Sequence, residues 1–155
     1  MSDVLVAHAR VFTRNRGITR DGLEVGSITF PMFSRRCTVV LDDVQVECRP
    51  VFFAVEVRDH SGLIARVNLG LCGFGAAMVT TSHGEFSLRN ACCTVHMRVK
   101  QGERTVALVH RKGFLSSNVR GTFADPFPTA FRAALLGIAC IRVEQQKSSS
   151  SGGGG

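Results

Sequence analysis

Apolar and polar residues alternate along most of the chain, and this two-residue period is typical of β-strands that bury one face. Segment 43–49 shows the pattern clearly, because Val44, Val46 and Cys48 alternate with polar or charged residues. Similar runs predict strands over residues 4–12, 26–30, 37–41, 76–80, 85–89, 92–100 and 104–109.

A β-hairpin is predicted over residues 53–69. Two alternating runs flank the turn formers of 59–62, a combination that favours a tight reversal of the chain. The buried face of the second run is expected to hold Leu63, Ala65, Val67 and Leu69. The whole pattern gives about nine or ten short strands, which indicates an antiparallel sandwich or barrel rather than βαβ units.

The pattern changes after residue 114, where turn formers lead to two prolines, Pro126 and Pro128. A helix is expected only after them, from about residue 129 to about residue 143. Almost no polar stripe lies between Arg132 and Arg142, whereas a surface helix carries a charged face. The helix is therefore expected to be buried, with a core of Phe131, Leu135, Leu136, Ile138 and Ile141.

The predicted fold is mainly β: an antiparallel barrel or strongly curved sheet wrapped around one buried C-terminal hydrophobic helix. A helix held between the sheet and a partner is the alternative. Apolar residues make up 45% of the chain and charged residues 20%, as expected for one domain with a real core. That domain is expected to span 1–146, and the Ser/Gly-rich run 147–155 is expected to be a disordered tail.

The formal net charge of +7 favours acidic partners such as nucleic acid, anionic lipid headgroups or an acidic protein. Alternation along 92–100 places three basic side chains on one face, and the next strand ends in three more. If the two strands pair, one surface holds the predicted anion-contact residues His96, Arg98, Lys100, His110, Arg111 and Lys112. Scattered, solvated charges are the alternative interpretation.

Cys92, Cys93 and His96 are residue types that bind zinc. Neighbouring residues of a strand point to opposite faces, so only Cys92 and His96 converge. A four-ligand site would then need His83 or His110 from another strand. We expect no metal and no other cofactor.

Enzymatic chemistry is not expected either. The glycine-rich segment 70–75 matches neither the dinucleotide fingerprint nor the P-loop. The five histidines fall in separate segments without a nucleophile motif nearby.

The N-terminal region reaches Arg10 without an apolar run of signal-peptide length. The six cysteines are too sparse for a disulfide scaffold, which suggests a reducing compartment. The longest apolar stretch, 133–141, is far shorter than the roughly 20 residues that span a bilayer. We expect an intracellular protein, cytoplasmic or peripheral to a membrane, without a transmembrane segment.

The dipeptide Phe127-Pro128, followed by the small and aliphatic segment 133–141, resembles a region of the phospholipid scramblases. The hairpin 53–69 is similar to the repeated hairpins of the same group. Together these segments resemble the tubby C-terminal-like superfamily, which includes the scramblases and the plant LURP-one-related proteins. The resemblance implies a barrel of twelve strands around a hydrophobic C-terminal helix, and the chain is short enough that some strands are expected to be missing.

The same resemblance implies association with phospholipid headgroups, particularly phosphoinositides. It does not extend to the calcium control of scramblases, because segment 122–126 keeps one carboxylate, Asp125, and calcium takes about six to eight oxygen ligands. The sequence therefore predicts a non-enzymatic module that contacts anionic phospholipid through a basic barrel face.

Two other functions fit the sequence: a basic nucleic-acid-binding protein, and a structural or assembly protein such as a viral or scaffold β-barrel. Stacking on single-stranded nucleic acid uses aromatic side chains, but the chain has no Trp or Tyr. Most of its 11 phenylalanines, such as Phe30, Phe53 and Phe86, fall at core positions. The candidates for exposed aromatic side chains are Phe33, Phe52 and Phe74.

Overall fold

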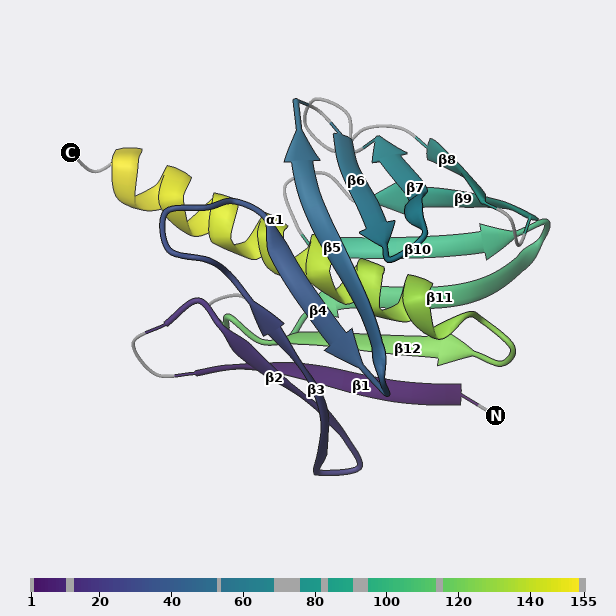
Figure 1. The fold of residues 1–155 in the computed structure, drawn as a ribbon, viewed down its shortest axis with the longest axis horizontal. Helices are drawn as coiled ribbons and strands as arrows, with labels where there is room; N and C mark the ends of the chain where they lie inside the picture. The colour runs from purple at the N-terminus through teal and green to yellow at the C-terminus, as the bar shows by residue number, and fades with distance from the viewer. Residues whose placement is uncertain are drawn as a thin grey trace.

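The computed structural model describes residues 2–10, 13–52, 54–68, 76–81, 84–90, 95–113 and 116–153, and within them it contains twelve strands and one helix (Figure 1). The strands are β1 (Ser2–Ala9), β2 (Arg16–Arg20), β3 (Leu23–Thr29), β4 (Cys37–Leu41), β5 (Val44–Val51), β6 (Ala54–Asp59), β7 (Gly62–Asn68), β8 (Ala76–Thr81), β9 (Gly84–Asn90), β10 (His96–Gln101), β11 (Arg104–Arg111) and β12 (Val119–Ala124). The helix α1 spans Thr129–Gly153.

The strands form one antiparallel sheet in the order β7-β6-β5-β4-β3-β2-β1-β12-β11-β10-β9-β8. Neighbours in sequence are therefore neighbours in space, and the first strand pairs with the last. The outermost strands β7 and β8 also lie next to each other. The twisted sheet thus curls into a nearly closed barrel, as strongly twisted sheets of many strands tend to do.

The C-terminal part of α1 lies at one end of the barrel. Because all pairings are antiparallel, β1, β3, β5, β9 and β11 end there, and β2, β4, β6, β10 and β12 begin there. The C-terminal part of α1 emerges at this end (Figure 1), where Glu144 contacts Arg16 at the start of β2 and Gln146 contacts Arg111 at the end of β11. We call it the helix-exit end.

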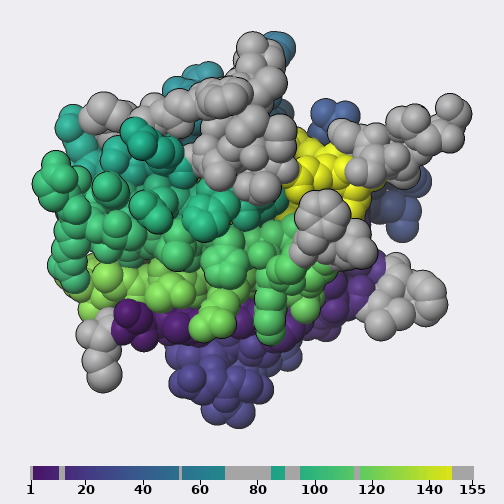
Figure 2. Space-filling view, turned by 180° about the vertical axis from the view of Figure 1, so that it is seen from behind, coloured from purple at the N-terminus to yellow at the C-terminus, as the bar shows by residue number. Residues whose placement is uncertain are grey.

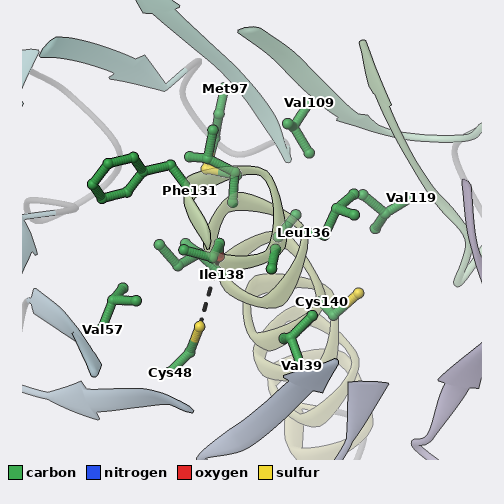
Figure 3. Close-up of a cluster of buried hydrophobic side chains, with 14 of the residues drawn as sticks. Val39, Cys48, Val57, Met97, Val109, Val119, Phe131, Leu136, Ile138 and Cys140 are labelled. Carbon is green, nitrogen blue, oxygen red and sulfur yellow. Dashed lines mark hydrogen bonds between the residues drawn. The ribbon is translucent and has the colours of Figure 1, made fainter. Parts of the chain in front are cut away.

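The helix packs inside the curved sheet, and every residue from 131 to 141 is buried. Inward-facing side chains of strands on several sides of the barrel, including Val39, Cys48, Val109 and Val119, point towards it (Figure 3). The helix residues expected in the core are among the buried ones: Phe131, Leu135, Leu136, Ile138 and Ile141. The predicted fold class, an antiparallel β-barrel around one C-terminal helix, is confirmed.

The helix is longer than expected. The sequence predicted its end near residue 143 and a disordered tail from 147, but α1 continues to Gly153. Adding a residue to an existing helix fixes few new dihedral angles for each hydrogen bond gained, so a poor helix former such as serine can extend it. The glycines at its end then favour termination.

The structure has more strands than the sequence pattern predicted, because β2 and β12 were not predicted. Segment 119–124 does alternate, with Val119, Gly121 and Phe123 buried. It was not predicted as a strand because turn-forming residues flank it on both sides. β2 spans only five residues. The described residues therefore form twelve strands rather than the nine or ten predicted.

The β6–β7 hairpin differs from the expected pattern at Leu63, which is 52% exposed rather than buried. Val57 pairs with Ala65 while Arg58 pairs with Leu63, so Ile64 is an extra residue in β7. Such a β-bulge shifts the facing of the residues beyond it. Leu63 consequently shares the outer face with Arg58, while Ala65 and Val67 are buried as predicted.

Candidate anion-binding face

The outward side of β10 is basic. Along this strand His96 and Arg98 are exposed and Lys100 is half-buried, whereas Met97 and Val99 between them are buried. This alternation is the one expected from the sequence, and it follows from the pleat of a strand that covers a hydrophobic core.

Strand register extends this basic side from β10 to β9, β11 and β12. His96 lies opposite His110 of β11, and their imidazole rings stack with centroids 6.1 Å apart. His110 in turn lies opposite Arg120 of β12. On the other side of β10, Arg98 lies opposite Arg89 of β9. We call the set Arg89, His96, Arg98, Lys100, His110 and Arg120 the basic face.

A hollow of about 140 Å³ lies within the basic face, lined by Ser87, Arg89, Arg98 and Lys100. Lys100 is opposite Ser87, so its ammonium group belongs to the same part of the sheet as the Arg89–Arg98 pair. The surface formed by β9 to β12 is turned towards the viewer in Figure 2. Two guanidinium groups, an ammonium group and a hydroxyl group are all suitable donors for an anion with several oxygens.

The arginines and the lysine of the basic face lack a carboxylate partner in the part of the chain that the structure describes. Among the described residues, no ion pair joins Arg89, Arg98, Lys100 or Arg120 to a carboxylate, although many other arginines have one. Like charges directly opposite each other in a sheet are destabilising. A bound anion would relieve the repulsion between Arg89 and Arg98.

Two of the predicted contact residues lie elsewhere. Arg111 was expected on this surface, but it pairs with the buried Val119 and therefore points to the inner side of the sheet. Its side chain donates hydrogen bonds to the carbonyl oxygen of Ser116 and, at 3.3 Å, to Oε1 of Gln146. Neighbouring residues of a strand face opposite ways, so placing both His110 and Arg111 on one face was wrong.

Lys112 lies just beyond the end of β11, where it is exposed at the helix-exit end. Its backbone N–H donates a hydrogen bond to the carbonyl oxygen of Asn118 at 2.8 Å, which fixes the position of the backbone. It borders the basic face rather than belonging to the hollow.

Arg89 and Arg120 are members of the basic face that were not predicted from the sequence. The alternation along β9 does place Arg89 outwards, but only the register of β9 against β10 shows that it faces Arg98. Arg120 was missed because its strand was not predicted. Register is the information that a single sequence lacks here, since hairpin turns and bulges set it.

The free cysteines Cys37, Cys48 and Cys140 are buried in the core. Cys37 and Cys48 lie opposite each other on β4 and β5 and are buried against α1. The pKa of Cys37 is raised by its hydrogen bond with Cys48 and by burial, and burial raises the pKa of Cys140 to about 12. Thiols held protonated in this way are poor nucleophiles and poor metal ligands.

The other sequence candidates for chemistry lie outside the described residues: His83, Cys92 and Cys93, and the glycine-rich segment 70–75. Within the described ranges, no three His, Cys, Asp or Glu residues are grouped closely enough to hold a metal ion. No helix of the described chain has the length and apolar character needed to cross a membrane.

The chain was also compared with known proteins. No protein-family model, no curated protein and no solved structure matches it.

Proposed function

We propose that this protein is a non-enzymatic binding module that contacts anionic phospholipid headgroups, including phosphoinositides, through the basic face. One observation carries the proposal: Arg89 and Arg98 face each other beside Lys100 around a hollow, and none of the three has a carboxylate partner among the described residues. A cluster of this kind is suited to a phosphate group.

The chemistry of the donors supports phosphate as the ligand group. The planar guanidinium group of arginine donates paired hydrogen bonds that fit phosphate oxygens, whereas an ammonium group acts as a point charge. Each Lys or Arg close to an anionic membrane surface contributes about 1 kcal/mol of attraction. Several such residues on one face of a basic protein therefore give useful affinity without a deep pocket.

The test is sedimentation with vesicles of phosphatidylcholine alone, with phosphatidylserine, or with a phosphoinositide, over a range of salt concentrations. We expect the double variant Arg89→Gln/Arg98→Gln to bind anionic vesicles about tenfold to thirtyfold more weakly. Binding of the unchanged protein should weaken as salt increases, because salt screens exposed charges.

Arg58→Gln/Arg66→Gln is the matched control, since it removes the same charge from the outer side of β6 and β7. There Arg58 already pairs with Glu56 at 3.3 Å, and Glu56 also lies opposite Arg66. This variant should bind as the unchanged protein does. Equal losses for both double variants would contradict a localised basic face.

Nucleic-acid binding and structural assembly are the competing functions. A labelled single-stranded RNA, added under the same conditions, separates the first from lipid binding. Binding to RNA and not to vesicles overturns the proposal, and so does binding to neither.

A further inference from the structure

Three large apolar side chains at the helix-exit end are almost fully exposed. Met32 and Phe33, in the loop between β3 and β4, are 82% and 97% exposed, and Phe52, in the turn between β5 and β6, is 97% exposed. Figure 1 shows the loop and the turn as separate projections from this part of the barrel. We call Met32, Phe33 and Phe52 the apolar tips.

The backbone holds both phenylalanines in an unfavourable conformation. Phe33 has a φ of 61° and Phe52 a φ of 53°, in the left-handed region that bulky residues rarely adopt. A bulky residue with a positive φ is strained, and glycine or asparagine would fit either position better. Folding alone does not explain why a phenylalanine stands at each tip.

Hydrogen bonds hold the loop that carries Met32 and Phe33 in place. Arg14 donates hydrogen bonds of 2.8 Å to the carbonyl oxygens of Pro31 and Ser34, and its guanidinium group lies 5.3 Å from the centre of the Phe30 ring. The N–H of Ser34 donates to the carbonyl oxygen of Pro31 at 3.1 Å, which closes the turn. Met32 and Phe33 therefore project from a defined turn.

Exposed cations lie close to the apolar tips along the chain. The exposed residues Arg35 and Arg36 follow Phe33 after one intervening serine, and Arg49 is an exposed residue of β5 shortly before Phe52. The basic face also reaches this end, because β10 begins at His96, β11 ends just after His110 and β12 begins just before Arg120. Apolar tips and positive charges thus occur together at one end of the molecule.

We infer that the apolar tips insert into the interfacial region of an anionic bilayer while the nearby arginines contact lipid phosphates. The inference rests on the proposed lipid binding and adds the part of the protein that enters the membrane. Apolar side chains on a cationic surface are the pattern of proteins that lie on membranes, where burial of apolar area adds to electrostatic attraction.

Other partners fit the apolar tips less well. Stacking on nucleic-acid bases requires a flat π-system, which Met32 lacks. A specific protein interface buries about 800 Å² on each partner, whereas these three side chains stand on two separate projections rather than one broad surface. A bilayer adapts to separate projections, so it accommodates both turns.

The absence of Trp and Tyr from the chain allows a direct test, because one introduced Trp is the sole strong fluorophore. The Trp emission of Phe33→Trp and of Phe52→Trp reports the surroundings of the apolar tips, and Leu23→Trp is the control. Leu23 is 73% exposed at the start of β3, at the opposite end of the barrel. The probes are vesicles of phosphatidylcholine and phosphatidylserine, with and without bromine on the acyl chains.

Tip insertion predicts a blue shift of Trp emission and quenching by brominated lipid for Phe33→Trp and Phe52→Trp, with neither change for Leu23→Trp. In a second measurement, Met32→Ser/Phe33→Ser should bind vesicles about tenfold more weakly even at high salt, since apolar burial is not screened. Circular dichroism confirms that each variant is folded.

The outcomes separate this inference from the proposed function. If the Trp variants sediment with anionic vesicles but show neither blue shift nor quenching, the insertion is wrong while headgroup binding stands. If Arg89→Gln/Arg98→Gln has no effect but tip emission shifts, insertion stands and the basic face is wrong. If RNA quenches the Trp emission in the absence of lipid, the apolar tips bind nucleic acid instead. If the protein forms concentration-dependent dimers that Met32→Ser/Phe33→Ser abolishes, the tips bind a second copy of the chain instead.

Discussion

Arg16 donates a hydrogen bond from Nη2 to Oε1 of Glu144 at 2.8 Å, which joins the first residue of β2 to the C-terminal half of α1. The Arg16 side chain is 1% exposed, and it also donates to the backbone carbonyl oxygens of Arg14 and Ser117. A guanidinium group this far from water requires such partners, because an unpaired buried charge is strongly unfavourable. The pair therefore fixes the position at which the helix leaves the barrel.

Glu144→Gln is expected to lower the free energy of unfolding by about 3 kcal/mol, because it removes the countercharge of a buried arginine. Urea denaturation followed by circular dichroism measures the change. Glu103→Gln, at an exposed turn residue between β10 and β11, is the matched control and should change stability by less than about 0.5 kcal/mol. Equal effects of the two substitutions would contradict the assigned role of the Arg16–Glu144 pair.

The close contact of α1 with β4 and β5 at Gly137 gives a second prediction. A Cβ atom there would lie 2.8 Å from Cγ2 of Val39 and 2.9 Å from Sγ of Cys48. Alanine is normally the better helix former by about 1 kcal/mol, but overpacking of a tight core costs about 1 to 3 kcal/mol. Gly137→Ala is therefore expected to lower the melting temperature.

Val39→Ala should partly rescue Gly137→Ala, and a double-mutant cycle measures the coupling between the two sites. Simple additivity would show that the predicted clash does not exist.

More severe changes, Gly137→Arg or Leu136→Asp, place a charge inside the barrel and should prevent folding, since that penalty approaches the whole stability of a small domain. Tolerance of either would mean that the helix is not buried in solution.

Asp3 gives a pH-dependent contribution to stability. Its carboxylate accepts hydrogen bonds from Arg20 at 2.6 Å and from Arg132 at 2.7 Å, which ties β1 to β2 and to α1. The Arg20 hydrogen bond is the main cause that lowers the pKa of Asp3, and Arg132 adds to it against the opposing effect of burial. A pKa lower in the folded state than in the unfolded state means that folding favours the ionised carboxylate.

The stabilisation from Asp3 should therefore be fully present above the unfolded pKa of about 4 and be lost as pH falls through the lower folded pKa. Unfolding free energies measured from neutral to acid pH test this. Asp3→Asn should be less stable at neutral pH, and its difference from the unchanged protein should shrink in acid. A stability difference that stays constant with pH would contradict this role of Asp3. The control is Asp43→Asn, at an exposed turn residue.

The sequence predicted the fold class because its strongest signals are local. Alternation marks a strand wherever one face is buried, and the segment after Pro128 lacks a polar stripe, which identified a buried helix. β4 was predicted with the bounds Cys37–Leu41 that the structure shows. The end of the helix was not predicted, because Ser and Gly composition does not reveal whether an existing helix continues.

The candidate site was only partly predictable, because it depends on pairing between distant strands. Alternation identified His96, Arg98 and Lys100 as one face of a strand. That Arg89 joins them follows from the register of β9 against β10, which the alternation along a single strand does not specify. The error at Arg111 arose from treating three consecutive residues as one surface, although successive side chains of a strand alternate between faces.

The opposite placement of Arg111 and Arg120 gives the last prediction. Both substitutions, Arg111→Gln and Arg120→Gln, remove one positive charge, so they are matched in net charge. Arg111 contacts Ser116 and Gln146, and its loss should lower the unfolding free energy by about 1 to 2 kcal/mol while vesicle binding changes little. Arg120 is exposed beside His110, and its loss should weaken vesicle binding about fivefold with little change in stability. Equal losses of binding in both variants would show that vesicles respond to total charge, and the localised basic face would then be wrong.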